Sequence, residues 1–319
     1  MQKDSDHLNI AISQIAPVWL DKAKTLDKII EQVEQAGKAG CRLVVFGETL
    51  LPGYPFWVEL TDGARFESDL QKEIFAHYLD QAVNPEAGDL DMLCQAAARH
   101  RIAVYVGCVE KAANRGGHSV YCSLVYINQQ GEIGSVHRKL VPTYEERLVW
   151  SNGDGHGLRV HSLGAFTVGG LNCWENWMPL SRAALYGQGE NLHVAVWPGS
   201  KRNTIDITRH IAKESRSYVI SASGLMRKED IPLSTPHYEE IVKGCPDIVA
   251  NGGSCLAGPD GNWIIEPVTD IETLLMATID HKEVRRERHN FDVCGHYSRP
   301  DVTRLTVNRK RQGLVEFED

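Results

Sequence analysis

Three segments of the sequence place a chemically active side chain at the end of a predicted strand. They are Phe46-Gly47-Glu48, His137-Arg138-Lys139 and Asn172-Cys173-Trp174, which offer a carboxylate, an ammonium group and a thiol. In α/β sheets, binding and catalytic groups gather in the loops just beyond strand ends. Taken singly, each has an ordinary alternative, because an isolated cysteine is usually a small buried apolar residue and an isolated Glu or Lys a solvated charge. Whether these three residues are catalytic must therefore be judged from the rest of the chain.

Several common functional motifs are absent. The sequence contains no GxxxxGKS/T, no GxGxxG after the first strand, no GxSxG and no HExxH, which excludes the simplest nucleotide-binding, serine-hydrolase and metalloprotease interpretations. The eight cysteines are scattered and form no CxxC pair, so a zinc site or a thioredoxin-like redox motif is not indicated. Unpaired cysteines also favour a reduced, cytoplasmic location.

Composition narrows the class of protein further. The 319 residues include 34 Lys plus Arg and 42 Asp plus Glu, a net charge of −8, which argues against nucleic acid as a partner. Hydrophobic residues make up 42% and charged residues 24%, the balance of a globular chain with a real core. No cationic flank with an apolar run marks the amino terminus, and no apolar run approaches the ~18 residues of a membrane span, so we expect neither secretion nor membrane insertion.

The hydrophobic pattern predicts an α/β fold with mixed sheets. Residues 8–15 alternate with period two, residues 20–39 repeat with helical spacing and residues 42–46 form a buried strand, which together make a βαβ unit. Further helices are expected at 88–100, 179–187 and 205–217, and further strands at 102–110, 123–128, 166–172, 192–197, 218–223, 254–257, 262–265 and 273–279. The turn Gly258-Pro259-Asp260-Gly261 joins two of them into a hairpin.

No linker divides the chain, so one large domain is expected over residues 1–282. From residue 281 to 289 opposite charges interleave, which indicates a solvated helix or a subunit contact rather than a nucleic-acid patch. We expect residues 283–319 to form a C-terminal extension that contacts another subunit.

Five blocks of sequence together resemble the nitrilase branch of the carbon-nitrogen hydrolase superfamily, in family order and over nearly the whole chain. The blocks are Phe46-Gly47-Glu48-Thr49-Leu50-Leu51-Pro52-Gly53-Tyr54-Pro55, His137-Arg138-Lys139-Leu140, Pro142-Thr143-Tyr144-Glu145-Glu146-Arg147, Asn172-Cys173-Trp174-Glu175-Asn176 and Gly295-His296-Tyr297-Ser298-Arg299-Pro300-Asp301. One departure is Cys122, at a position where family members often have Asn. It falls on a predicted strand, and we expect little consequence from it.

The resemblance implies an α-β-β-α sandwich in which Glu48, Lys139 and Cys173 converge and Glu146 supports them. A cysteine with a pKa near 8.5 is only a few per cent thiolate at neutral pH, so it needs an adjacent base, for which Glu48 is the candidate. The thiolate of Cys173 would attack a nitrile to give a thioimidate, then a thioester, with Lys139 and the Trp174 N–H as donors to the nitrogen. Glu146 would orient Lys139; its alternative is an ion pair with Arg138 or Arg147.

Four aromatic residues near the blocks are candidates for the walls of a nitrile pocket, because small-molecule sites are mostly apolar. They are Tyr54, Trp57, Trp174 and Trp197. Core packing is the alternative for each. The resemblance also implies a homo-oligomer, a dimer or a larger spiral assembly. Its substrates would be an organic nitrile and water, and we expect the reaction to use no metal and no organic cofactor.

Other functions stay open at this level. The same site could hydrolyse an amide, or hydrate a nitrile or cyanide and stop at the amide. A Cys-His hydrolase would use His193, His210 or His237 as its base, although no spacing supports that arrangement. A non-enzymatic assembly or sensor protein is the last alternative, but such a protein has no need of the Glu-Lys-Cys trio.

Overall fold

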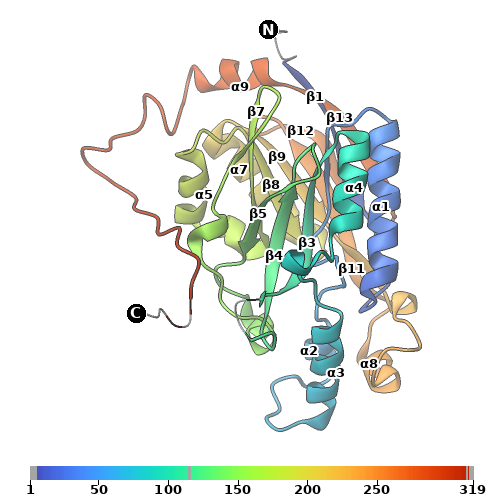
Figure 1. The fold of residues 1–319 in the computed structure, drawn as a ribbon. Helices are drawn as coiled ribbons and strands as arrows, with labels where there is room; N and C mark the ends of the chain where they lie inside the picture. Colours follow the sequence, from blue (N-terminus) through green and yellow to red (C-terminus); the bar gives the residue numbers. More distant parts are fainter. Residues whose placement is uncertain (1–5, 114–115, 314, 316–319) are drawn as a thin grey trace.

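A computed structural model describes residues 6–113, 116–313 and 315 of the chain, and its centre is a pair of β-sheets (Figure 1). The first sheet contains β1 (His7–Gln14), β2 (Leu43–Val45), β3 (Ala103–Lys111), β4 (Val120–Ile127), β5 (Ile133–Arg138) and β13 (Thr273–Asp280). Their order is β13-β1-β2-β3-β4-β5. The neighbours β1, β2 and β3 are parallel, whereas β13, β4 and β5 each join antiparallel.

The second sheet is mixed in the same way. It contains β6 (His161–Leu163), β7 (Phe166–Asn172), β8 (Leu192–Trp197), β9 (Tyr218–Ser223), β10 (Leu225–Arg227), β11 (Ile248–Ala257) and β12 (Trp263–Thr269). The order is β10-β11-β9-β8-β7-β6, and β12 also pairs with β11. The central strands β7, β8 and β9 are parallel, so their carboxyl ends lie at one edge of the sheet.

Helices cover the outer face of each sheet. The α-helices are α1 (Lys22–Lys38), α2 (Trp57–Leu60), α3 (Asp69–Asp80), α4 (Asp91–His100), α5 (Pro179–Tyr186), α6 (Lys201–Thr204), α7 (Ile207–Ser215), α8 (Tyr238–Gly244) and α9 (His281–Arg288). The 3-10 turns are η1 (Pro85–Ala87), η3 (Tyr144–Leu148), η4 (Gly155–Gly157), η5 (Cys173–Trp177) and η6 (Lys228–Asp230). Among the described residues, no helix combines the length and the apolar character needed to cross a bilayer.

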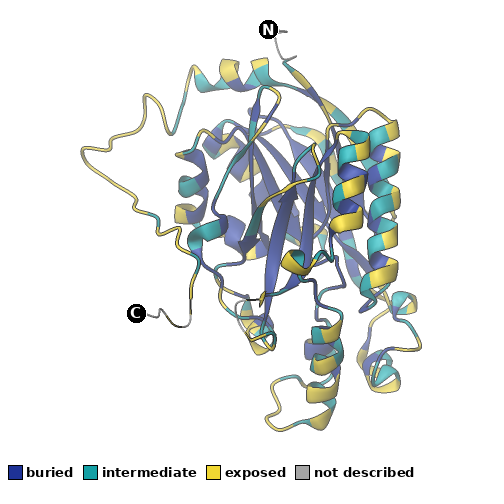
Figure 2. Ribbon diagram, in the orientation of Figure 1, coloured by how far each residue is buried: buried dark blue, intermediate teal, exposed yellow. Residues whose placement is uncertain are grey.

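Alternation along the strands builds the layers. In β1, Ile10 and Ile12 face the second sheet and join a core that includes Val194 of β8, whereas Ala11 faces outward and packs with Ile29 and Val33 of α1. The outer face of the second sheet packs on α7 in the same manner. Figure 2 shows the sheets as buried and the outer helix surfaces as exposed. The predicted α-β-β-α sandwich with mixed sheets is confirmed.

Most expected elements are present with shifted ends. The strands predicted at 166–172, 192–197 and 218–223 have these bounds in the structure, while β11 begins at Ile248 rather than at 254. Helix α3 was not predicted, because only Ile74 and Tyr78 are buried and its apolar stripe is therefore short. Helix α9 spans the expected boundary at 283.

Beyond α9, the chain runs along the outside of the body (Figure 1). It is anchored near its end, where the Arg311 guanidinium lies 3.0 Å from the buried Asp154 carboxylate, which also accepts a hydrogen bond from the Gln312 backbone N–H. Residues 1–5, 114–115, 314 and 316–319 of the two expected regions lie outside the described residues.

Candidate active site

An ammonium group between two carboxylates forms the centre of the site. Lys139 Nζ donates to Glu48 Oε1 at 2.9 Å and to Glu146 Oε2 at 2.7 Å. The side chains of all three are at most 1% exposed. Cys173 lies beside them, and one side-chain atom each from Cys173, Glu48 and Glu146 lie within 4.8 Å of one another. A thiol, two carboxylates and one ammonium group thus share a single buried cluster.

The sheet edges explain how Glu48 and Lys139 meet across 91 residues of sequence. Glu48 follows β2 and Lys139 follows β5, and these strands end on the same edge because β5 is antiparallel to β4 and β4 is antiparallel to β3. The Glu48 N–H donates to the Trp197 carbonyl at 3.1 Å, at the end of β8, which joins the two sheets here. A side chain at Gly107 would lie 2.7 Å from the Glu48 Cα, so only glycine permits this approach.

Cys173 is the first residue of η5 and forms a sharp turn directly after β7. Its φ is +47°, a left-handed backbone conformation that is rare for residues other than glycine and that is typical of functional sites. The Asn176 side chain donates to the Cys173 carbonyl at 2.9 Å and to the Leu171 carbonyl at 3.2 Å, which holds the turn. The backbone N–H of Trp174 lowers the pKa of the Cys173 thiol and so favours its ionised form, against the larger effect of burial.

Two carboxylates support the turns around this cluster. Glu146 Oε2 also accepts the Thr143 N–H, and Glu146 Oε1 accepts the Tyr54 hydroxyl at 2.8 Å. Glu175, fully buried, accepts the N–H groups of Leu140 and Asn172 and so ties the chain after Lys139 to the strand that precedes Cys173. The lysine and the thiol are therefore held by the same framework.

Burial sets the protonation behaviour of the cluster. Burial, opposed by Lys139 and aided by the neighbouring Glu146, raises the pKa of Glu48 to about 7. Burial also raises the pKa of the Cys173 thiol well above its usual range. For Lys139, burial alone would lower the pKa, but Cys173, Glu48 and Glu146 raise it well above its ordinary value. Lys139 is therefore a permanent cation beside a carboxyl group that can exchange a proton near neutral pH.

The cluster of Glu48, Glu146 and Cys173 also has the donor atoms of a metal site. However, Lys139 Nζ already contacts both carboxylates and neutralises one of their charges. Its ammonium group bridges one oxygen of each carboxylate. We therefore interpret the cluster through its thiol and its proton acceptors.

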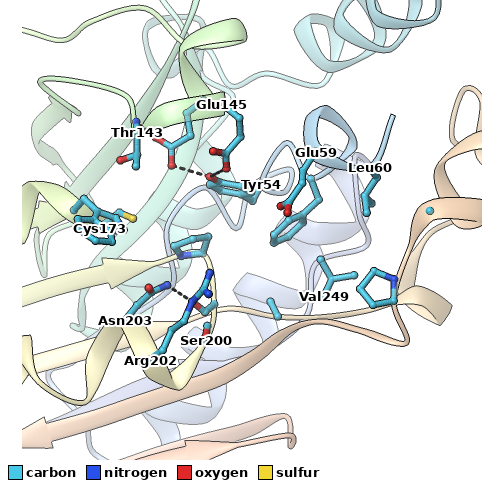
Figure 3. Close-up of a pocket in the computed structure, with 18 residues that line it drawn as sticks. Tyr54, Glu59, Leu60, Thr143, Glu145, Cys173, Ser200, Arg202, Asn203 and Val249 are labelled. Carbon is cyan, nitrogen blue, oxygen red and sulfur yellow. Dashed lines mark hydrogen bonds between the residues drawn. The ribbon is translucent and has the colours of Figure 1, made fainter. Parts of the chain in front are cut away.

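Cys173 lines a cavity of about 860 Å³, a volume that suits a small organic molecule (Figure 3). Tyr54, Phe56, Trp174 and Pro198 supply apolar surface. Charged groups on the wall are Glu59, Glu145, Glu146 and Arg202. In Figure 3 the Tyr54 hydroxyl lies between two carboxylates, and the Cys173 sulfur faces the cavity.

The four predicted aromatic residues separate into two groups. Tyr54 and the 54% exposed Trp174 are on the cavity wall. Trp57 is buried against Tyr78, with ring centroids 4.7 Å apart, and Trp197 is buried under α7. Neither lines the cavity, because the side chains of both point into core layers. What Trp197 contributes near the site is its backbone carbonyl.

The alternative partners named for these residues are engaged elsewhere. Arg138 forms a two-point pair with Glu110, at 2.7 and 2.9 Å, and Arg147 donates to the Pro142 carbonyl, so neither pairs with Glu146. His193 contacts Glu190 and Asn176, His210 is near Glu214, and His237 contacts Glu73. None of these histidines lines the cavity that contains Cys173.

Sequence reasoning missed several residues of the site. Cys122, at the position that departs from the family pattern, donates its thiol hydrogen to Glu48 Oε1 at 3.3 Å. Glu145 accepts the Tyr54 hydroxyl at 3.2 Å, Ser200 precedes α6, and Arg202 and Asn203 lie on α6. The departure from the family pattern was the signal that could have drawn attention to Cys122.

Comparison with known proteins identifies the family. The model of the carbon-nitrogen hydrolase family matches residues 9–289. A protein called nitrilase 2, from an unknown prokaryotic organism, is 38% identical over 98% of this chain and 96% of its own length. An aliphatic nitrilase of Sinorhizobium fredii (strain HH103) is 34% identical over 96% of this chain and 97% of its own. This chain belongs to the nitrilase branch of the carbon-nitrogen hydrolase family. The resemblance carried by the five sequence blocks is confirmed, and the protein is a hydrolase of carbon-nitrogen bonds.

One further relative and two solved structures extend the comparison of this member of the nitrilase branch. A bifunctional nitrilase/nitrile hydratase of Oryza sativa subsp. japonica is 34% identical over 96% of this chain and 85% of its own. Among solved structures, a carbon-nitrogen hydrolase from Helicobacter pylori has a TM-score of 0.70 at 19% identity and covers 92% of this chain and 96% of its own. An amidase from Nesterenkonia sp. has a TM-score of 0.64 at 17% identity, with 91% and 96% covered. These two structures share the fold.

Proposed function

We propose that this enzyme is a nitrilase that hydrolyses an organic nitrile to a carboxylic acid and ammonia, with Cys173 as the nucleophile. The observation that carries the proposal is the buried cluster of Glu48, Lys139, Glu146 and Cys173, of which Glu146 and Cys173 line a cavity large enough for a small organic nitrile. The nitrilase names of relatives at 38% and 34% identity over nearly the full chain support the choice of a nitrile.

The first step is attack of sulfur on the nitrile carbon. Glu48, whose pKa of about 7 leaves it partly ionised at neutral pH, takes the proton of the Cys173 thiol. The thiolate adds to the carbon, and Glu48 returns the proton to the nitrogen, which gives a thioimidate. Negative charge that develops on the nitrogen is stabilised by the Lys139 ammonium group and by a hydrogen bond from the Trp174 N–H.

Two waters complete the reaction. Glu48 activates the first, which adds to the thioimidate carbon and gives a tetrahedral intermediate. Loss of ammonia leaves a thioester, and the second water releases the acid and restores the thiol. If the tetrahedral intermediate expels sulfur instead of ammonia, an amide leaves after a single water. Glu146 and Tyr54 hold Lys139 in place throughout.

The amide is the second candidate product. One relative at 34% identity is named a bifunctional nitrilase/nitrile hydratase, so both outcomes occur among proteins similar to this chain. An amidase reaction would use the same groups on a different substrate. The nitrilase names of the similar sequences place the nitrile first.

Product analysis tests the proposal directly. Purified protein is offered aliphatic, aromatic and arylacetic nitriles beside their matching amides, and products are followed by mass spectrometry and an ammonia assay. Acid and ammonia from nitriles, with the amides left largely intact, support a nitrilase. Turnover of the amides alone assigns an amidase. No turnover of either compound class, with the wild type and Cys173→Ala alike, would favour an assembly or sensor role.

We further propose that the enzyme is a cytoplasmic homo-oligomer in which residues 283–319 contact another subunit. In this extension Tyr297 is 59% exposed and Val302 is 67% exposed. A partner subunit would cover this apolar surface. All eight cysteines are free, which suits a reducing compartment. Light scattering should give a multiple of the 35.6 kDa chain mass. Val302→Asp should lower it, whereas Leu233→Asp, at another exposed apolar position, should not.

A further inference from the structure

The two oxygens of Glu48 have different surroundings. Oε1 accepts hydrogen bonds from Lys139 Nζ at 2.9 Å and from Cys122 Sγ at 3.3 Å. Oε2 is buried and has no hydrogen-bond partner among the described residues. Unpaired buried oxygens are costly, so their presence calls for a functional explanation. The carboxylate is thus held through one oxygen while the other is left available.

Cys122 contacts two of the three charged residues of the cluster, Glu48 and Lys139. It lies on β4 opposite Val109, is 1% exposed, and its carbonyl accepts the Lys139 N–H at 2.8 Å. Its main chain therefore holds the lysine segment while its side chain holds the carboxylate. Burial and the nearby Glu48 carboxylate raise the pKa of the Cys122 thiol well above its usual range, so it keeps its hydrogen and remains a donor.

We propose that Cys122 is a positioning residue for Glu48: with Lys139 it holds Oε1, so that Oε2 is the oxygen that accepts the proton of Cys173. In this step the S–H bond of Cys173 breaks and an O–H bond forms on Oε2, which leaves a thiolate beside the Lys139 ammonium. The return of that proton to a nitrile nitrogen rests on the proposed function. Deprotonation of the thiol does not.

The strength of the Cys122 donor sets how readily Glu48 accepts a proton. A thiol is a weak hydrogen-bond donor, whereas a hydroxyl would stabilise the carboxylate more strongly. The other titratable groups that influence Glu48 or its partner are Lys139 after β5, Glu146 on η3, Cys173 on η5, Tyr54 after β2 and Tyr78 on α3. A change at Cys122 leaves all of them in place.

Two substitutions of opposite effect test the proposal. Cys122→Ser supplies a stronger donor and Cys122→Ala supplies none. The rate of Cys173 alkylation by iodoacetamide, read by mass spectrometry of the labelled peptide, is measured from pH 5 to pH 9. We expect the midpoint of the acid limb to fall by about half a pH unit or more in Cys122→Ser and to rise by a similar amount in Cys122→Ala. The acid limb of kcat/KM should shift likewise.

Cys108→Ser is the matched control, because Cys108 is a buried cysteine of the neighbouring strand β3 that does not line the cavity. It should leave the midpoint unchanged. Shifts of the same sign in both Cys122 variants, or no shift in either, would overturn the proposal. If Cys122→Ala does not fold, Cys122→Val provides the variant without a donor. Alkylation needs no nitrile, so failure of the nitrilase proposal would appear separately, as absence of turnover by the wild type.

Discussion

Replacement of Glu48 by Gln should abolish turnover and at the same time stabilise the fold. The buried cluster of Glu48, Glu146 and Lys139 carries two carboxylates against one ammonium group, and burial raises the pKa of Glu48 from an ordinary 4.5 to about 7. Between these two pH values the folded chain binds more protons than the unfolded chain, so stability falls as pH rises. The difference of about 2.5 pH units corresponds to about 3 kcal/mol at pH 8.

Glutamine avoids this cost because it is neutral, and its carbonyl can still accept from Lys139 and Cys122. We therefore expect the Glu48→Gln variant to unfold at a Tm several degrees above the wild type at pH 8, with a much smaller difference at pH 5. Turnover should fall about a thousandfold or more, because Gln cannot accept the proton of Cys173. The assays are thermal unfolding at the two pH values and ammonia release from the best nitrile.

Glu132→Gln, at an exposed position between β4 and β5, controls for the loss of a surface charge and should change neither quantity. A Glu48→Gln variant that is less stable than the wild type at pH 8 would refute the reasoning, because Lys139 would then stabilise the carboxylate by more than burial costs. A variant with near-normal turnover would exclude Glu48 as the base.

Further predictions concern the same cluster and its approach. Cys173→Ala should abolish turnover and substrate-derived mass labelling while Tm stays within a few degrees; retained activity would point to another thiol. In the wild type, kcat/KM should decline about tenfold per pH unit below about pH 7 as Glu48 is protonated, and a profile flat down to pH 5 would contradict this assignment. Tyr54→Phe removes the hydroxyl that donates to Glu146 and should lower kcat about tenfold through a looser Lys139, whereas an effect confined to KM would indicate substrate contact instead. Gly107→Ala places a methyl group 2.7 Å from the Glu48 Cα and should lower stability by about 2 kcal/mol or more, seen as a drop in Tm.

The sequence was most informative about local structure. Residues 166–172 and 192–197 read as strands because apolar runs of that length leave few alternatives, and both have these bounds in the structure. Helix α3 was missed because its charged sequence buries only Ile74 and Tyr78, which is too short a stripe to stand out. Propensity and periodicity are properties of neighbouring residues, so they predict single elements well.

The same distinction between local sequence and packing applies to the residues of the candidate site. Residue type and position at strand ends, together with the five blocks, indicated Glu48, Lys139 and Cys173. The direction of a side chain depends on the layer that packs against it. Trp174 is 54% exposed on the cavity wall, while Trp197, of the same residue type, has 0% exposure under α7.

The class of fold, the family and the residue types available for thiol chemistry could all be predicted from the order of residues. Packing of the two sheets was needed to show that Glu48 and Lys139, which follow β2 and β5 and are 91 residues apart, bring a carboxylate to 2.9 Å from an ammonium group, and that Cys122 joins them. It also produced the raised pKa of Glu48, because burial is a property of the packed molecule and not of the glutamate. The chemistry of the site thus depends on the exclusion of water. Water is excluded only when both sheets and their helices have packed around the cluster.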